Sequence, residues 1–494
     1  MSRIVCISNR VSLPDPETGQ INAGGLAVGV KAALESNGGG IWFGWDGSVR
    51  KLNGKSRQIT QMTCGDITFL TMPLREREYE DYYKGMANEH LWPMMHGLGQ
   101  HIKARPNVYS VYRDVNRTFA RRIRPFLQPD DLIWVHDYHL IPLGREFRAL
   151  GIRNPIGYFH HIPIPSEEFI RGPQVPLFLK KQYSQLVRDL FDYDLVGFQT
   201  FRDLENFAVS LGQRPSVSER FRGERIRHEG KSACFGVFPI SVETYDLALA
   251  ARQNAERAPL LKTEGKTLIG AERLDYTKGL PHRLIGFHEF LEQHPEHRDG
   301  VQYTQITPLS RADIEQYQTA IRDTRQVAAE IRDDFESEEN RPLVYCEKGV
   351  PREELLGRLR SADVGLVTPL IDGQNLVAKE FLAVQDPRDP GMLVLSKYAG
   401  AAEELERLGV LCVDPTNPAD IAEKINQALT MPLPARIETY RKTITHLYRY
   451  DIEHWTESFL NELIKAPGKT AWRSSRVSGN APVFPIKPYN NHRF

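Results

Sequence analysis

The chain has 494 residues, more than one hydrophobic core usually spans, so two or more domains are expected. Its 63 Lys and Arg balance 63 Asp and Glu, and this zero formal charge excludes a global attraction to nucleic acid or anionic lipid. The hydrophobic fraction of 41% is typical of a folded globular protein. No stretch approaches the roughly 18 apolar residues of a membrane span.

The N-terminal run Ile4 to Ser8 predicts a first strand and lacks the long apolar region of a signal peptide. The five cysteines are scattered, without the spacing of a zinc site or a redox dithiol. We therefore expect a cytoplasmic protein with reduced, structural thiols.

Short apolar runs in the first half predict buried strands with helices between them, which indicates an α/β fold with a mainly parallel sheet. These runs are residues 41–43, 67–70, 132–135 and 195–198. From about Lys266 the alternation is cleaner, and six strand-like runs are each followed by a helical segment. They are residues 267–271, 301–306, 343–346, 364–367, 392–396 and 411–413. We expect them to build a second doubly wound domain.

The join between the domains is placed near 237–241, where a strand ends before a charge-rich helical segment. The predicted domains are residues 1–240, residues 241–455, and a third segment, 456–494. That last segment is expected to form a helix that returns to the first domain, followed by a basic tail that contains prolines.

Polar residues directly after predicted strands are the candidates for a site, because doubly wound sheets bind ligands beyond the carboxyl ends of their strands. In the first domain, 8–10 follow the first strand, and 23–29 open a helix whose N–H groups can hold a phosphate. Residues 136–139 and 160–161 follow two later strands. Such buried histidines beside carboxylates are structural as readily as functional.

In the second domain, residues 272–279 place Arg273 and Lys278 in a strand-to-helix loop, where two cations can clamp a diphosphate. A surface ion pair is the alternative interpretation. Residues 368–380 combine a strand end, a turn and a helix start. The first-turn N–H groups can hold a phosphate, and Glu380 is placed for ribose hydroxyls.

Three other patterns are not supported. The segment 265–267 lacks the glycine that a phosphate-binding loop needs five positions earlier. Residues 192–194 lead into an apolar run, which favours a strand-edge turn over a metal site. The strand-end histidines lack the cysteines or the His-Glu-x-x-His spacing of a zinc site. We expect neither a metal nor a cofactor.

With these motifs assembled, the chain strongly resembles the trehalose-6-phosphate synthases of glycosyltransferase family 20, from about Ser2 to Leu463. The strings that carry the resemblance are 7–10, 23–30, 42–45, 91–93, 134–140, 192–200, 272–281 and 372–380. It implies the GT-B fold, with two doubly wound Rossmann-like domains that face a central cleft. It also implies metal-independent, retaining transfer of glucose from a nucleotide diphosphate, with UDP-glucose expected, to glucose 6-phosphate.

The resemblance also implies residue roles where the motifs match. The catalytic residues would be Asp137, His161, Arg273 and Lys278. The donor would be bound by Gly25, Arg273, Lys278, Asp372, Gln374, Asn375, Leu376 and Glu380. The acceptor would be bound by Arg10, Trp42, Tyr83, Trp92, Asp137 and Arg311. Of these, Arg10 and Arg311 would clamp the sugar phosphate and His161 would orient the donor sugar.

Three positions depart from the family pattern. Gln374 stands where methionine is usual, His160 where an apolar residue is usual, and Ser241 where a hinge glycine is usual. Related pseudo-glycosyltransferases that join nitrogen-containing cyclitols carry a string similar to 372–375. An aminocyclitol phosphate or glycerol 3-phosphate as acceptor therefore stays open, and so does a catalytically silent sugar-phosphate sensor.

The expected partners are small-molecule substrates, with neither nucleic acid nor membrane, and a homo-oligomer is left open. No phosphatase domain is expected after Leu463, so removal of the product's phosphate would fall to another protein.

Overall fold

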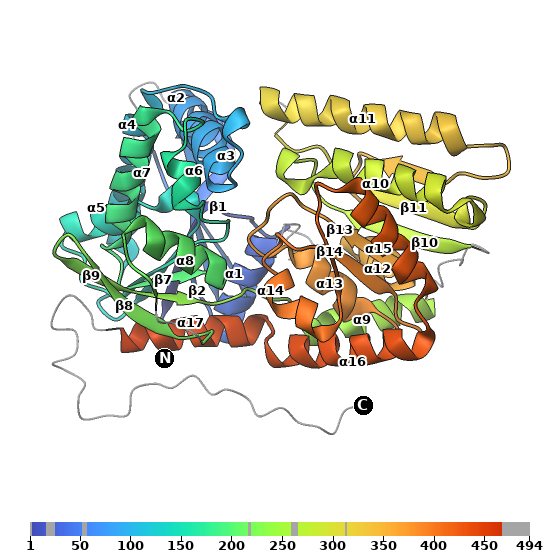
Figure 1. Ribbon diagram of the computed structural model, residues 1–494. Helices are drawn as coiled ribbons and strands as arrows, with labels where there is room; N and C mark the ends of the chain where they lie inside the picture. The colour runs from blue at the N-terminus through green and yellow to red at the C-terminus, as the bar shows by residue number, and fades with distance from the viewer. Residues whose placement is uncertain are drawn as a thin grey trace. The chain divides into compact units, whose positions relative to one another are not determined.

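The computed structural model describes residues 2–15, 25–51, 57–215, 219–257, 265–311 and 314–466 (Figure 1). The chain divides into two compact units: unit 1 comprises Met1–Ile240 and Ile452–Phe494, and unit 2 comprises Ser241–Asp451. The predicted basic tail lies outside the described residues. No described helix has both the length and the apolar character needed to cross a membrane.

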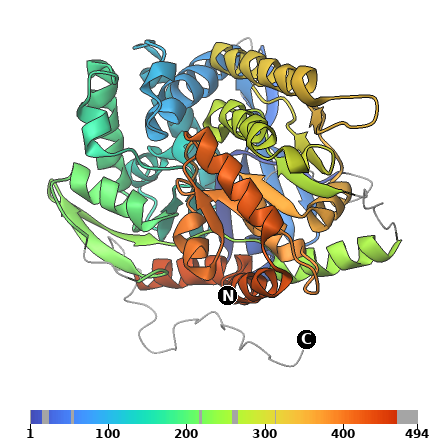
Figure 2. The same cartoon turned by 45° about the vertical axis from the view of Figure 1, so that its right-hand side comes forward.

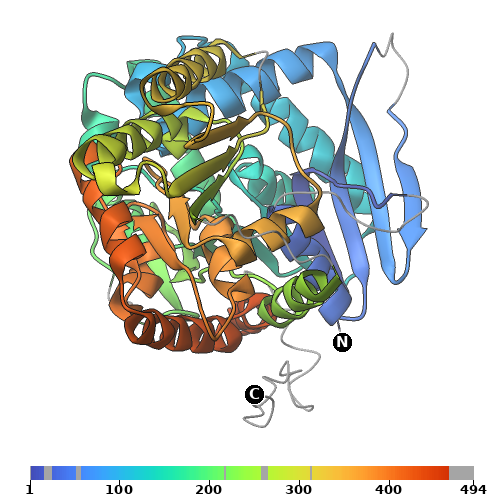
Figure 3. The ribbon, with the colours of Figure 1, turned by 90° about the vertical axis from the view of Figure 1, so that its right-hand side faces the viewer.

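Unit 1 is built on a nine-stranded sheet in the order β3-β4-β2-β1-β5-β6-β7-β9-β8. Its strands are β1 (Ile4–Arg10), β2 (Gly40–Arg50), β3 (Thr60–Cys64), β4 (Ile67–Arg75), β5 (Leu132–His136), β6 (Ile156–Phe159), β7 (Leu195–Phe198), β8 (Gly223–His228) and β9 (Lys231–Val237). Neighbouring strands are parallel except in two edge hairpins, β3–β4 and β8–β9. Figure 3 shows β2, β3 and β4, in blue, side by side at one edge. The predicted mainly parallel sheet is confirmed.

The helices of unit 1 are α1 (Gly25–Ser36), α2 (Glu76–Glu78), η1 (Tyr79–Leu91), α3 (Trp92–Met95), η2 (Gly99–His101), α4 (Val108–Ile123), η3 (Arg124–Phe126), η4 (Tyr138–Leu140), α5 (Leu143–Ala149), α6 (Glu167–Arg171), α7 (Leu177–Leu190), α8 (Phe201–Ser210) and α17 (Ile452–Lys465). The last of these packs on α1, β6 and β7. Its Phe459 ring stacks on Trp134 at 4.8 Å between centroids. A Cβ at Gly157 of β6 would lie 2.7 Å from the Phe459 ring, so this glycine leaves the room that α17 occupies.

Unit 2 is built on a six-stranded, wholly parallel sheet in the order β12-β11-β10-β13-β14-β15. Its strands are β10 (Lys266–Ala271), β11 (Val301–Ile306), β12 (Leu343–Cys346), β13 (Val364–Val367), β14 (Met392–Ser396) and β15 (Leu411–Val413). Its helices are α9 (Thr244–Arg257), η5 (Tyr276–Lys278), α10 (Leu280–Gln293), η6 (Pro295–His297), α11 (Glu315–Phe335), α12 (Arg352–Ser361), α13 (Leu376–Val384), α14 (Ala402–Leu405), η7 (Glu406–Leu408), α15 (Pro418–Thr430) and α16 (Leu433–Arg449). All six predicted strands are present.

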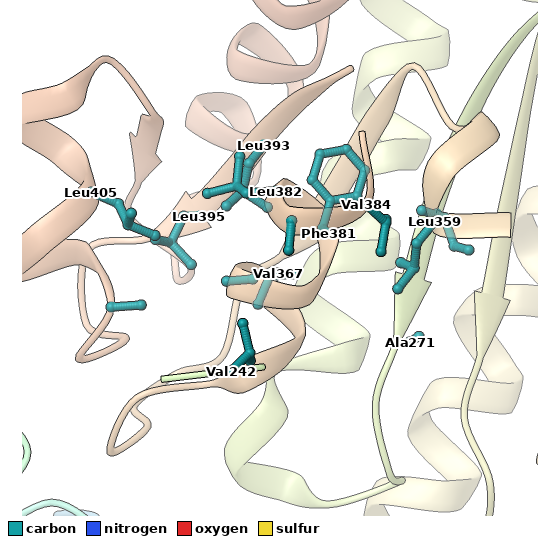
Figure 4. Close-up of a cluster of buried hydrophobic side chains, with 14 of the residues drawn as sticks. Val242, Ala271, Leu359, Val367, Phe381, Leu382, Val384, Leu393, Leu395 and Leu405 are labelled. Atoms are coloured by element: carbon teal, nitrogen blue, oxygen red, sulfur yellow. The ribbon is translucent and has the colours of Figure 1, made fainter. Parts of the chain in front are cut away.

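Both faces of the unit 2 sheet are buried, which is why its strands are continuous apolar runs. Successive strand residues point to opposite faces, so Leu268 packs with α10, α11 and α15, while Ile269 packs with α9, α12 and α13. Figure 2 shows α10 in yellow-green beside α15 in orange-red. Figure 4 shows the other cluster, in which Phe381 and Leu382 of α13 meet Val367 and Leu395 of the sheet.

Candidate active site

The predicted motifs flank the point in each sheet where the strand order changes direction. In unit 1 this point lies between β1 and β5, and in unit 2 it lies between β10 and β13. Arg10 ends β1 and Asp137 follows β5, while residues 272–279 follow β10 and 368–375 follow β13. Ligands of doubly wound sheets bind at such switch points. The two constellations are described separately.

Arg10 presents an exposed cation at the end of β1. Its guanidinium carbon lies 5.9 Å from the ring centroid of Trp45. Gly47 has a φ of 87°, and a Cβ there would lie 2.9 Å from a guanidinium nitrogen of Arg10. Because Gly47 has no side chain, it leaves room for the guanidinium group of Arg10.

The two tryptophans of string 42–45 occupy different environments. Trp42 is 0% exposed, and its indole Nε1 donates to Ser8 Oγ at 2.8 Å. Ser8 Oγ in turn donates to the carbonyl of Arg10 at 2.9 Å, so Trp42 supports the Arg10 segment from within the sheet. The direct acceptor contact predicted for Trp42 stays a prediction, and its ring has no accessible surface here. Trp45, which lies beside Arg10, was not among the site residues predicted from the sequence.

An aromatic platform lies next to Arg10. The Tyr83 ring is 5.2 Å from Trp45, 5.4 Å from Tyr79 and 6.2 Å from His139, between centroids. Tyr79 and Tyr83 both lie on η1, a π-helix, in which the wider turn brings residues four apart into a stacked pair with a 20° interplanar angle. Aromatic faces of this kind suit the apolar faces of a sugar.

Two further predicted residues lie at helix starts. Trp92 begins α3 and is 6% exposed, with its ring 5.7 Å from that of Tyr138. Gly25 begins α1, as the predicted helix opening requires. Residues 23–24 of that motif lie outside the described residues.

Asp137 has a strained backbone, with a φ of 75°. Its N–H donates to Phe159 O at 2.8 Å, and its carboxylate accepts the N–H of His161 at 3.3 Å. Five non-glycine residues of the described chain have positive φ, and three of them are predicted site residues: Asp137, Arg311 and Asn375. Backbone strain of this kind collects at functional sites, which favours the predicted roles.

Burial favours the neutral form of three strand-end histidines of unit 1, His136, His160 and His161. Burial lowers the pKa of His136 to about 3 and that of His160 to about 3. Burial, followed by the charges of His136 and His160, lowers the pKa of His161 well below its ordinary value. His160, which departs from the family pattern, is 1% exposed, and its Nδ1 shares a hydrogen bond with the Tyr158 hydroxyl at 3.0 Å.

In unit 2 the Lys278 ammonium forms an ion pair with the Asp372 carboxylate, joining motifs that are 94 residues apart. The same two segments are tied by Leu370 N, which donates to Thr277 O at 2.8 Å. Arg273, the second predicted cation, is exposed. Lys278 thus lies next to the segment that leads into α13.

A buried frame supports this segment. Arg283 of α10 is 0% exposed, and its guanidinium lies 2.6 Å from Glu272 Oε2 and donates to Thr368 Oγ1 at 2.8 Å. The other oxygen of Glu272 accepts from the side chain of Asn375 at 3.0 Å. Asn375 is the residue before α13, with a φ of 68°, so the frame fixes the start of that helix. Neither Glu272 nor Arg283 was assigned a role from the sequence.

Arg311 is held by Tyr317, whose hydroxyl accepts from the guanidinium at 2.5 Å and donates to Asp275 at 3.0 Å. Arg311 and Asp275 form an ion pair at 3.7 Å. Burial alone would raise the pKa of Asp275, but the charge of Arg311 and the N–H of Thr277 bring it below its ordinary value. A charged pair therefore persists at this strand end.

The remaining predicted residues lie along the start of α13, of which Leu376 is the first residue. Gln374 is 3% exposed, and its backbone carbonyl accepts from Ala401 N at 3.1 Å. Glu380 lies 3.2 Å from Arg352. Burial raises the pKa of Glu380, although the charge of Arg352 acts in the opposite direction.

In the part of the chain that the structure describes, no group of three or more His, Cys, Asp or Glu side chains could hold a metal ion. Asp192 pairs with Lys231 at 2.7 Å and Asp194 with Arg148 at 2.6 Å. Both carboxylates lie in the turn before β7, so the predicted turn is present at residues 192–194.

The model of glycosyltransferase family 20 matches residues 8–465 of the chain. A trehalose-6-phosphate synthase of Sinorhizobium fredii is 41% identical over 470 residues, which cover 94% of this chain and 98% of that protein. An α,α-trehalose-phosphate synthase (UDP-forming) of Burkholderia xenovorans, solved with glucose-6-phosphate, has a TM-score of 0.86 at 36% identity and covers 94% of this chain and 100% of its own. An E. coli structure bound with UDP-2-fluoro glucose has a TM-score of 0.82 at 36% identity and covers 94% and 99%.

Proposed function

The chain belongs to glycosyltransferase family 20, and from this premise we propose that it transfers glucose from UDP-glucose to glucose 6-phosphate with retention, giving α,α-trehalose 6-phosphate. The synthases that match it do so along almost their whole length. Similar structures hold glucose-6-phosphate in one case and UDP-2-fluoro glucose in another, which supports this choice of acceptor and donor.

The observation that carries the proposal is the position of Lys278. Its ammonium pairs with Asp372, four residues before α13. The N–H of Ala378 in the first turn of that helix donates to Asn375 O at 3.3 Å, and the N–H groups before it, at a helix start, have no carbonyl of the helix to bond. A cation and free helix N–H groups in one place suit a diphosphate. In the proposed reaction the diphosphate competes with Asp372 for Lys278.

In the proposed step the bond between C1 of glucose and UDP breaks, and a bond to the acceptor's anomeric oxygen forms on the same face of the sugar. The proton of the acceptor hydroxyl goes to the leaving phosphate oxygen. Arg273 and Lys278 stabilise the negative charge on UDP, and each such contact contributes about 3 kcal/mol to transition-state stabilisation. In this proposal the reaction needs no metal ion.

On the acceptor side, we assign the sugar phosphate to Arg10 and, separately, to Arg311. The sugar itself is assigned to the platform of Tyr83 with Trp45, and its hydroxyls to Asp137. Trp45 enters this proposal because its ring lies beside both Arg10 and Tyr83. The cytoplasmic location is part of this proposal.

The experiment follows nucleotide release from UDP-, GDP- and ADP-glucose by the purified chain without added metal. Glucose 6-phosphate, glycerol 3-phosphate and an aminocyclitol phosphate are supplied in turn. The proposal expects release that depends on glucose 6-phosphate and is fastest with UDP-glucose. If nucleotide is released only with glycerol 3-phosphate or the aminocyclitol phosphate, that compound replaces glucose 6-phosphate as the assigned acceptor. If the sugar phosphate binds tightly and no nucleotide is released, the chain is a silent sensor.

A further inference from the structure

The ring of His161 is contacted on both nitrogens. Its Nε2 lies 3.1 Å from Nδ1 of His136, and its Nδ1 lies 3.3 Å from the amide nitrogen of Gln199. The three side chains come at or just after the ends of β5, β6 and β7, which are adjacent in the sheet. Gln199 is 2% exposed, and His161 is partly buried.

The backbone sets which way the Gln199 amide faces. Its Oε1 accepts the N–H of Ile240 at 2.9 Å, and a backbone N–H can only donate. The NH₂ group of Gln199 therefore faces His161 and donates to Nδ1. It follows that His161 carries its proton on Nε2 and donates it to Nδ1 of His136.

This arrangement resists protonation of His161. A proton on Nδ1 would set an N–H against the NH₂ group of Gln199. If the amide turned over, its NH₂ group would face the N–H of Ile240 instead. Either change sets a donor against another donor at the buried Gln199 amide, which is unfavourable. Burial and the neighbouring histidines also lower the pKa of His161.

We propose that Gln199 is a positioning residue, which holds His161 as the neutral Nε2–H tautomer for glucosyl transfer. The inference rests on the proposed function, in which positive charge develops on the donor sugar as its bond to UDP breaks. An imidazolium at His161 would oppose that charge. The other titratable groups that face His161 are His136, His160 and Asp137.

The tautomer is measured directly in the full chain by NMR of nitrogen-15-labelled histidine, with His161 assigned through His161→Gln. The inference expects a neutral ring with its proton on Nε2 throughout the range from about pH 5.5 to pH 8.5. A proton on Nδ1, or titration of His161 within this range, would overturn it. This readout needs no turnover, so it stands apart from a failure of the proposed function.

Two variants of Gln199 separate positioning from packing. Gln199→Glu keeps an acceptor for Ile240 N–H but replaces the donor to His161 by a carboxylate, which raises the pKa of the imidazole. We expect kcat at pH 6 to fall about tenfold relative to pH 8.5, with each KM changed less than about twofold. Gln199→Met, of similar size and without charge, lowers kcat at every pH and adds no pH dependence.

A pH profile of Gln199→Glu that matches the native chain would overturn the inference, as would the same new pH dependence in Gln199→Met. Circular dichroism checks that each variant folds. If Gln199→Glu does not fold, the NMR measurement on the native chain decides the question alone.

Discussion

The two units place opposite chemistry at the same point of similar sheets. At the switch point of unit 1, the strand ends carry neutral histidines and an aromatic platform, with the exposed Arg10 beside them. At that of unit 2, the strand ends carry ion pairs, among them Lys278 with Asp372 and Arg283 with Glu272. In the proposed function, this difference assigns recognition of the sugar to the rings and hydrogen bonds of unit 1, with Arg10 beside them, and stabilisation of the diphosphate to the cations of unit 2.

The largest expected effect comes from the buried frame of unit 2. Arg283→Met leaves Glu272 as a buried charge without its cation, and we expect the free energy of unfolding to fall by about 3–5 kcal/mol. Arg325→Met is the control, because it breaks an exposed pair with Glu347 and should cost less than about 1 kcal/mol. Urea unfolding measures the free energy of unfolding of both variants. An equal decrease in the two would contradict the claim that Arg283 stabilises unit 2 by pairing with the buried Glu272.

The next effect is catalytic. Lys278→Ala should lower kcat at least about a hundredfold with the fold intact, because the leaving diphosphate loses a cation. Lys266→Ala is a matched control: Lys266 also pairs with an aspartate, Asp363, but at the opposite end of β10. Steady-state kinetics compare the two. Near-normal turnover in Lys278→Ala would refute its leaving-group role.

A smaller effect distinguishes the units by pH. Burial lowers the pKa of His160 to about 3, so below the unfolded value of about 6.5 the unfolded chain binds a proton that the folded chain does not. This side chain should therefore remove about 2 kcal/mol of stability between pH 7 and pH 5. Urea unfolding at both pH values should show the loss reduced by about that amount in His160→Leu. An unchanged loss in the variant would contradict the neutral state of His160.

A buried carboxylate of unit 2 has the opposite pH window. Burial alone would raise the pKa of Glu404, but Lys379 and His446 lower it to about 2. The stability that Glu404 contributes is present above its unfolded pKa, about 4.5, and is lost only as the pH falls below that value. Between pH 7 and pH 5, the free energy of unfolding therefore changes through the histidines, while the contribution of Glu404 stays constant.

The smallest effect concerns the acceptor. Arg311→Ala should raise KM for glucose 6-phosphate about tenfold and change kcat less, because the contact is made equally in the ground state and the transition state. Tyr317→Phe removes the hydroxyl that holds Arg311 and should shift KM in the same direction by a smaller factor. A decrease in kcat by a larger factor than the increase in KM would show that Arg311 acts in the chemical step and not only in binding.

The predicted strands could be found because each contains a short run of buried apolar residues, and their order along the chain gives α/β directly. The edge strands β3 and β8 were not predicted, because most of their residues are polar and not buried. The motifs after β10 and β13 could also be predicted, because polar residues that directly follow an apolar run can be recognised in the sequence. That Lys278 meets Asp372 was not predictable, because the pair depends on the order of strands 94 residues apart.

Burial explains the other omissions. Trp42 and Trp45 stand in one string, and only the structure shows that the first is enclosed and the second lies beside Arg10. Arg283 resembles any helix arginine in sequence, yet it is wholly buried. Gln199 gains its role from a contact 38 residues away, which needs β6 and β7 to be neighbours.

The most direct test of the whole account is the product formed from UDP-glucose labelled with carbon-13 at C1 and unlabelled glucose 6-phosphate. NMR of the isolated disaccharide phosphate reports both the linkage and the configuration at the labelled carbon. The account predicts an α,α-1,1 linkage with the α configuration of the donor kept. A β configuration at the labelled carbon, or release of free labelled glucose with no disaccharide, would contradict it.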